Sequence, residues 1–154
     1  MKLLNAWVFD DGGKPESIKG KGDCVVRAIA IAGQIRYEDV ADALRPRCTE
    51  LNRKAAAGKR KRLSGRSSVT GGVHKEVYHQ WLLDQGWTWT PTMKIGQGCK
   101  VHLRADELPS GRLIARLSKH LCAVVDGVIH DIHDPSRDGT RCVYGYYSKK
   151  EVQP

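Results

Sequence analysis

The stretch from Gly22 to Gly33, Gly-Asp-Cys-Val-Val-Arg-Ala-Ile-Ala-Ile-Ala-Gly, is typical of a short buried helix. Asp23 is a favourable N-cap, because its carboxylate can accept a hydrogen bond from a backbone N–H group of the first turn. Gly33 suits the left-handed position that follows the last turn. Arg27 is the single charged residue between them, so the helix has no polar face and is predicted to lie in the core.

Cys24 lies in the first turn of this predicted helix. The N-terminus of a helix carries unpaired N–H groups and a partial positive charge, which favour the reactive thiolate form of a cysteine. A free cysteine is more often a small buried hydrophobic residue without chemistry. The position of Cys24 therefore indicates a nucleophile only if a base lies elsewhere in the chain.

Composition limits the class of protein. A chain of 154 residues with 40% hydrophobic and 28% charged residues is predicted to form one globular domain over residues 1–154. No apolar run approaches the length of a membrane span, and the first residues lack the apolar core of a signal peptide. We therefore expect no membrane association.

The formal net charge is +9, and Lys and Arg residues concentrate between Arg45 and Arg66. Residues 52–72, which include Lys59-Arg-Lys-Arg62, are predicted to be an exposed basic insertion. A solvated loop is one interpretation, and a site for nucleic acid or an acidic protein partner is the other.

The chain has five cysteines, at positions 24, 48, 99, 122 and 142, with no Cys-x-x-Cys pair. An odd number argues against a disulfide framework, and the spacing argues against a four-cysteine zinc site. These features predict a reducing, cytoplasmic location and no cofactor.

The order of the predicted elements indicates an α+β fold, with helices first and an antiparallel sheet after them. Helices are expected at 24–33, from 37 until Pro46 interrupts the second one, and at 73–85. Strands are expected at 3–9, 87–90, 112–117, 120–125, 128–133 and 141–147.

Asp126-Gly127 is a strong signal for a two-residue hairpin turn. In that register Val125 pairs with Val128, and His120 shares a sheet face with Asp131 and His133. A bulged turn would instead bring Asp134 to the face of His120, and the sequence leaves both registers open. Either register supplies a His–Asp pair that could serve a cysteine nucleophile.

A metal site is the rival interpretation of the same segment. His130, Asp131, His133 and Asp134, with Cys122 or Cys142 nearby, are zinc-ligand types. Because His130 and His133 are three residues apart on a predicted strand, their side chains should point to opposite faces. We therefore expect no metal ligands.

Three motifs together resemble the papain-like cysteine peptidase superfamily: Gly-Asp-Cys24 at the start of an apolar helix, His120-Leu-Cys-Ala-Val-Val, and Asp134-Pro135. The resemblance is closest to the leader-peptide-cleaving peptidase domains of bacteriocin exporters. Residues 96–147 also resemble small uncharacterised proteins of phages and prophages. Ile18 and Lys19 occupy the region where papain-like enzymes usually have a Gln.

The resemblance implies a papain-like fold and a cysteine-dependent hydrolase of peptide or isopeptide bonds. It assigns Cys24 as the nucleophile, His120 as the general base and acid, and Asp134 as the residue that orients His120. Asp131 and His133 remain alternatives for that last role. A non-catalytic binding module, which engages nucleic acid or an acidic host protein through the basic segment, is the alternative function.

Overall fold

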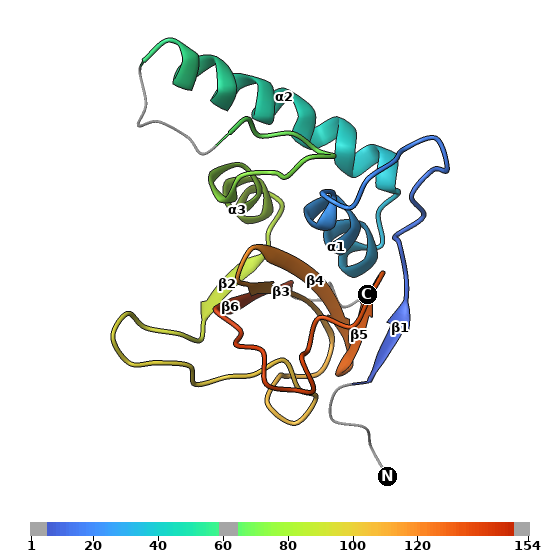
Figure 1. The fold of residues 1–154 in the computed structure, drawn as a ribbon, viewed down its shortest axis with the longest axis vertical. Helices are drawn as coiled ribbons and strands as arrows, with labels where there is room; N and C mark the ends of the chain where they lie inside the picture. The colour runs from blue at the N-terminus through green and yellow to red at the C-terminus, as the bar shows by residue number, and fades with distance from the viewer. Residues whose placement is uncertain (1–5, 59–64, 150–154) are drawn as a thin grey trace.

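A computed structural model of the protein describes residues 6–58 and 65–149. It is an α+β fold, with a six-stranded mixed sheet in the order β1-β5-β4-β3-β6-β2. Helices α1 and α3 lie on one face of the sheet, and α2 lies across both of them (Figure 1). The elements are β1 (Trp7–Phe9), α1 (Cys24–Gly33), α2 (Tyr37–Ala56), α3 (Lys75–Asp84), β2 (Thr88–Pro91), β3 (Arg112–Leu117), β4 (His120–Val125), β5 (Val128–Asp131) and β6 (Gly145–Ser148).

Helix α1 occupies the core, as its sequence predicts. All residues from Val25 to Ala32 are buried, and the helix packs mainly on β4. The predicted capping residues at the two ends of the helix do not have the roles expected of them. Asp23 precedes the helix but forms no capping hydrogen bond, because its carboxylate contacts charged side chains instead. Gln34, and not Gly33, adopts the left-handed conformation, with φ of 55°.

Helix α2 buries the apolar face predicted for it, including Tyr37, Val40 and Leu44. The expected interruption at Pro46 is wrong, because the helix continues through it to Ala56. The first residues of the expected insertion at 52–72 are therefore helical. Residues 59–64, with most of the basic run, lie outside the described part of the chain.

The strand pairing settles the register of the hairpin between β4 and β5. Val125 pairs with Val128 and Ala123 pairs with His130, which is the two-residue register. Asp126 and Gly127 both have positive φ, at 49° and 80°, as this type of turn requires. Strand β5 ends at Asp131, two residues earlier than expected, and β6 begins at Gly145 instead of at Arg141.

A buried ion cluster joins the start of α1 to the end of β5. The guanidinium of Arg27 contacts the carboxylate of Asp23, one turn earlier, and lies 3.6 Å from Asp131. All three side chains are at most 3% exposed. Lys14 pairs with Asp23 at 3.0 Å, and the Tyr37 hydroxyl donates to Asp23 at 2.6 Å. Buried charges are tolerated when paired in this way.

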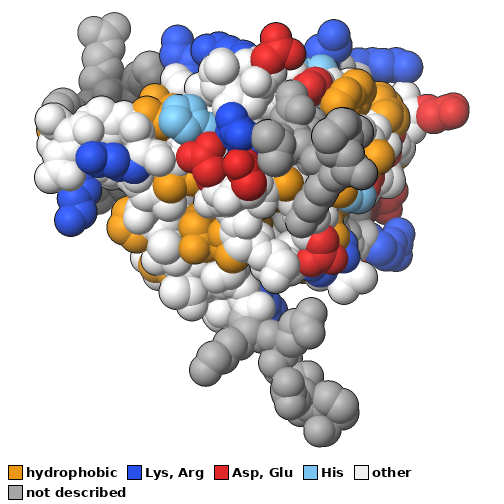
Figure 2. Space-filling model, turned by 90° about the horizontal axis from the view of Figure 1, so that it is seen from below, with side chains coloured by type: hydrophobic (Ala, Val, Ile, Leu, Met, Phe, Trp, Pro, Cys, Tyr) orange, Lys and Arg blue, Asp and Glu red, His pale blue; other side chains and the backbone are white. Residues whose placement is uncertain are grey.

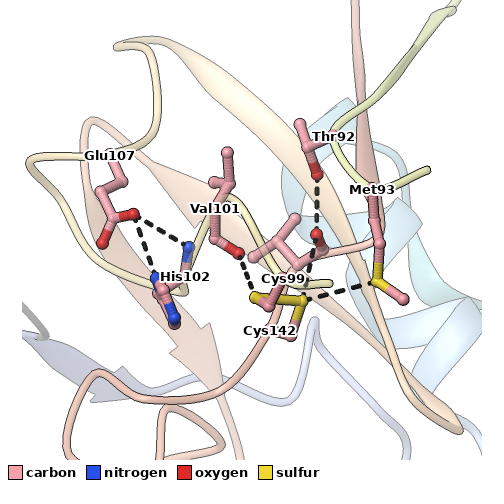
Figure 3. Close-up of a disulfide and its surroundings, with 8 residues drawn as sticks. Thr92, Met93, Cys99, Val101, His102, Glu107 and Cys142 are labelled. Atoms are coloured by element: carbon pink, nitrogen blue, oxygen red, sulfur yellow. Dashed lines mark hydrogen bonds and ion pairs between the residues drawn. A yellow bond between two sulfur atoms is a disulfide. The ribbon is translucent and has the colours of Figure 1, made fainter. Parts of the chain in front are cut away.

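Cys99 and Cys142 form a disulfide, which the argument against a disulfide framework did not foresee (Figure 3). Their Cα atoms are 5.8 Å apart, and the bond joins the loop after β2 to the segment before β6. Cys24, Cys48 and Cys122 are free. Disulfides persist mainly in oxidising compartments, so this bond does not support the predicted cytoplasmic location. That location stays a prediction.

The described surface has mixed charge where it faces away from α2. Figure 2 shows Lys and Arg side chains interspersed with Asp and Glu on this face, with small hydrophobic areas between them. Among the described helices, none has the length and apolar character needed to cross a membrane.

We predict that Arg27→Met lowers the free energy of unfolding by about 3–5 kcal/mol, because two buried carboxylates lose their shared cation. Arg36→Met is the matched control. Arg36 pairs with Glu38 at an exposed site, so its loss should cost about 0–1 kcal/mol. Urea unfolding of both variants measures the difference, and equal losses would contradict the structural role of Arg27.

We also predict that the unfolded protein, purified without reductant, exposes three titratable thiols and gives five after reduction. Peptide mapping should recover a linked pair that contains Cys99 and Cys142. Cys142→Ser should release Cys99 as an additional thiol without reductant. Five thiols in the unreduced parent protein would show that the bond is absent.

Candidate active site

A cleft of about 320 Å³ lies where the start of α1, the start of α3 and the turn between β3 and β4 meet. Cys24 lies in its wall, at the first residue of α1, and His120 lies opposite at the first residue of β4. The residues that line the cleft are Cys24, Val25, Gly72, Val73, Lys75, Tyr78, Arg116, Leu117, Ser118, Lys119, His120, Leu121 and Tyr144.

The side chains of Cys24 and His120 both line the cleft, and His120 acts on the thiol through hydrogen bonding and through its charge. Burial opposes ionisation of Cys24, but the hydrogen bond and charge of His120 outweigh it. The backbone of Leu121 and the charge of Arg27 act in the same direction, so the pKa of Cys24 lies below its ordinary value. The site therefore favours the thiolate form of Cys24 more than an ordinary environment would.

His120 is held by Asp131 on the side away from Cys24. Its Nε2 atom lies 2.6 Å from Oδ2 of Asp131, which leaves Nδ1 as the ring nitrogen for the thiol. Burial disfavours the imidazolium form, but the hydrogen bonds with Asp131 and Cys24 raise the pKa of His120 to about 9. His120 is therefore a cation at neutral pH, positioned between Asp131 and Cys24.

Asp131 is itself fixed at both carboxylate oxygens. Oδ1 accepts a hydrogen bond of 2.7 Å from the backbone N–H of Ile132 and lies 3.6 Å from Arg27. Oδ2 is the oxygen that faces His120. The contacts therefore form a series from the Arg27 ion cluster through Asp131 and His120 to Cys24.

The two other candidates for the partner of His120, Asp134 and His133, are both exposed. Asp134 is exposed, and its carboxylate accepts from the backbone N–H of Ser136 at 2.9 Å, as in a local turn. His133 lies close to His120, with ring centroids 5.3 Å apart, but is exposed. In this arrangement Asp131, which the sequence left open, has the place that the family resemblance assigned to Asp134.

The segment also contains a group with metal-ligand character. Ligand atoms of His120, Asp131 and His133 lie within 4.8 Å of one another, so these three residues could hold a cation. The other candidates from the sequence are separated: His130 contacts Asp10 at 2.9 Å, and Cys142 is in the disulfide. A metal ion bound there would occupy His120 and Asp131, the two residues that connect Cys24 to the Arg27 ion cluster.

Sequence reasoning missed the contribution of Arg27. It identified Arg27 as an isolated polar residue in an apolar helix, and the buried cluster explains its presence. The spacing of Asp23 and Arg27 was an available signal, because residues four apart lie on one helix face. The contact with Asp131, more than a hundred residues away, has no signal in the sequence.

Comparison with models of known protein families finds no match, and neither the curated proteins nor the solved structures that were searched include a match.

Proposed function

We propose that this protein is a cysteine-dependent hydrolase of peptide or isopeptide bonds, built on a papain-like scaffold. Cys24 is the nucleophile, His120 the general base and acid, and Asp131 the residue that orients His120. The observation that carries the proposal is the series of contacts from Cys24 through His120 to Asp131 at the wall of a cleft. A reactive thiol, a proton carrier and an orienting carboxylate are what acyl transfer requires.

In the acylation step, the Cys24 thiolate attacks the carbonyl carbon of the scissile bond. A carbon–sulfur bond forms, and the carbonyl oxygen takes the negative charge. The His120 imidazolium then gives its proton to the leaving nitrogen as the carbon–nitrogen bond breaks. An amine leaves, and the acyl group remains as a thioester on Cys24.

In the deacylation step, neutral His120 takes a proton from water while the water oxygen attacks the thioester. Collapse of the tetrahedral intermediate breaks the carbon–sulfur bond and releases a carboxylate. Cys24 and His120 regain the ion-pair state in which they began. Asp131 keeps the ring orientation fixed through both steps.

The start of α1 supports this chemistry. The helix has no side-chain cap, and its positive end lies at the cleft beside Cys24. The developing oxyanion would lie near the backbone N–H of Cys24, where that field stabilises it. Lys19 and Lys21, which lie near the position of the usual Gln, are exposed, so the backbone N–H of Cys24 is the better oxyanion donor of the three.

The function is tested with p-nitrophenyl acetate, an activated ester that acylates thiols without a specific binding site. We predict a burst of about one equivalent of nitrophenolate, with the acetyl group on Cys24 by peptide mass spectrometry. Cys24→Ala should abolish the burst and keep the fold. A burst of equal size in Cys24→Ala would overturn the proposal.

The orienting residue is tested by a matched pair of substitutions in the same assay. Asp131→Asn should slow acylation by at least about tenfold, because losing the carboxylate lowers the pKa of His120 and so the thiolate fraction. Asp134→Asn removes the same charge from an exposed turn and should change the rate less than twofold. A larger effect at Asp134 would return the orienting role to that residue.

The pH dependence follows from the two shifted groups. We predict that iodoacetamide alkylation of Cys24 begins at a lower pH than for an ordinary thiol and reaches a plateau, because His120 lowers the pKa of the thiol. Turnover of an amide substrate should fall again as the pH rises through about 9, because the His120 imidazolium that protonates the leaving nitrogen then loses its proton. Peptide mass spectrometry between pH 4 and 10 measures the alkylation rates.

Two comparisons interpret this profile. Cys48 is an internal control, since burial raises the pKa of its thiol. His120→Gln should move the onset of Cys24 alkylation towards alkaline pH. Burial raises the pKa of the thiol, and His120 would no longer offset that effect. If Cys24 reacts with the same pH profile as Cys48, the thiolate–imidazolium pair does not exist.

A further inference from the structure

The cleft beside Cys24 is lined by basic side chains. Lys75 at the start of α3, Arg116 on β3 and Lys119 in the β3–β4 turn all line it, and no Asp or Glu is among the lining residues. A concave surface with charges of one sign concentrates ligands of the opposite sign. The cleft therefore has the electrostatic character of an anion site.

None of these three cations has a carboxylate partner within the described ranges 6–58 and 65–149. In the same ranges, Arg27, Arg47 and Arg104 do pair with carboxylates. Lys75 and Lys119 are exposed, so solvent can satisfy their charges. Arg116 is half-buried, which makes the missing partner more costly.

Arg116 is positioned by its surroundings. Arg116 pairs with Leu121 on β4 and with Gly145 on β6, which places it in the interior of the sheet near the end of β3. Its guanidinium carbon lies 5.8 Å from the ring centroid of Trp89, at cation–π distance. Such stacking orients the planar guanidinium and leaves its N–H groups able to bind a carboxylate in a bidentate manner.

We propose that the cleft selects peptide substrates with an acidic side chain next to the scissile bond, and that Arg116 binds this carboxylate with support from Lys75 and Lys119. This inference rests on the proposed function, because it names the substrate class of the same site. Arg116 acts as a specificity residue and takes no part in proton transfer. Substrate binding supplies the missing partner of a half-buried cation.

The test uses blocked dipeptidyl chloromethyl ketones, which alkylate Cys24 from within the cleft. Each probe carries Asp or its neutral isostere Asn, at the first or the second residue from the reactive carbon. The measured quantity is the ratio of second-order inactivation rate constants for the Asp and Asn probes. We expect a ratio of about ten at one of the two positions, the effect of a charge-assisted hydrogen bond.

Substitutions assign the selectivity. Arg116→Gln should bring the ratio close to one, and the exposed double substitution Lys75→Gln with Lys119→Gln should lower it partly. Lys100→Gln removes an exposed lysine that does not line the cleft and should leave the ratio unchanged. The double variant keeps the test valid if Arg116→Gln fails to fold.

A ratio near one at both positions in the parent protein overturns the acidic specificity. So does a ratio of ten that persists in both cleft variants, because other groups would then provide it. Neutral iodoacetamide separates the two proposals, since its rate depends on the thiol and not on Arg116. A slow iodoacetamide reaction rejects the hydrolase, while the Asp-to-Asn ratio still reports the charge preference of the cleft.

Discussion

The structure depends on the buried guanidinium of Arg27 and the two carboxylates that it contacts, Asp23 and Asp131. Removing charged groups from water is costly, and the cost is recovered when each charge meets a well-placed partner. The Nε atom of Arg27 has no hydrogen-bond partner, so its charge is balanced mainly through the other nitrogens. Because Asp23 precedes α1 and Asp131 ends β5, this pairing fixes the start of the helix relative to the end of β5. The distance between Cys24 and His120 follows from that constraint.

Local patterns predicted the parts of the fold that local forces determine. The apolar run after Asp23 predicts a buried helix, and Asp126-Gly127 predicts a hairpin turn, since both depend on neighbours in sequence. The N-cap role predicted for Asp23 was wrong, because the side chains of Lys14 and Arg27 bind its carboxylate in place of the helix backbone. The choice between Asp131 and Asp134 was left open for a related reason. It depends on the hairpin register, which the pairing of β4 with β5 decides.

Other errors came from rules applied beyond their range. An odd number of cysteines excludes complete pairing, but it allows one disulfide, as Cys99 and Cys142 show. Proline is unfavourable inside a helix, yet α2 continues past Pro46 because residues on both sides bury an apolar face. Leu44 before the proline and Leu51 after it are both buried. In each case the packing of distant segments decided what local preference left open.

The charge balance around the candidate site links its chemistry to its specificity. With Cys24 as a thiolate and His120 as an imidazolium, the contacting groups contain equal numbers of positive and negative charges, which are Lys14, Arg27 and His120 against Asp23, Asp131 and Cys24. Moving a proton between Cys24 and His120 leaves this total unchanged, so the buried cluster tolerates both states. The cleft cations Lys75, Arg116 and Lys119 are not part of this neutral cluster. Their charge is therefore available to a substrate, and the half-buried Arg116 gains most from an anionic one.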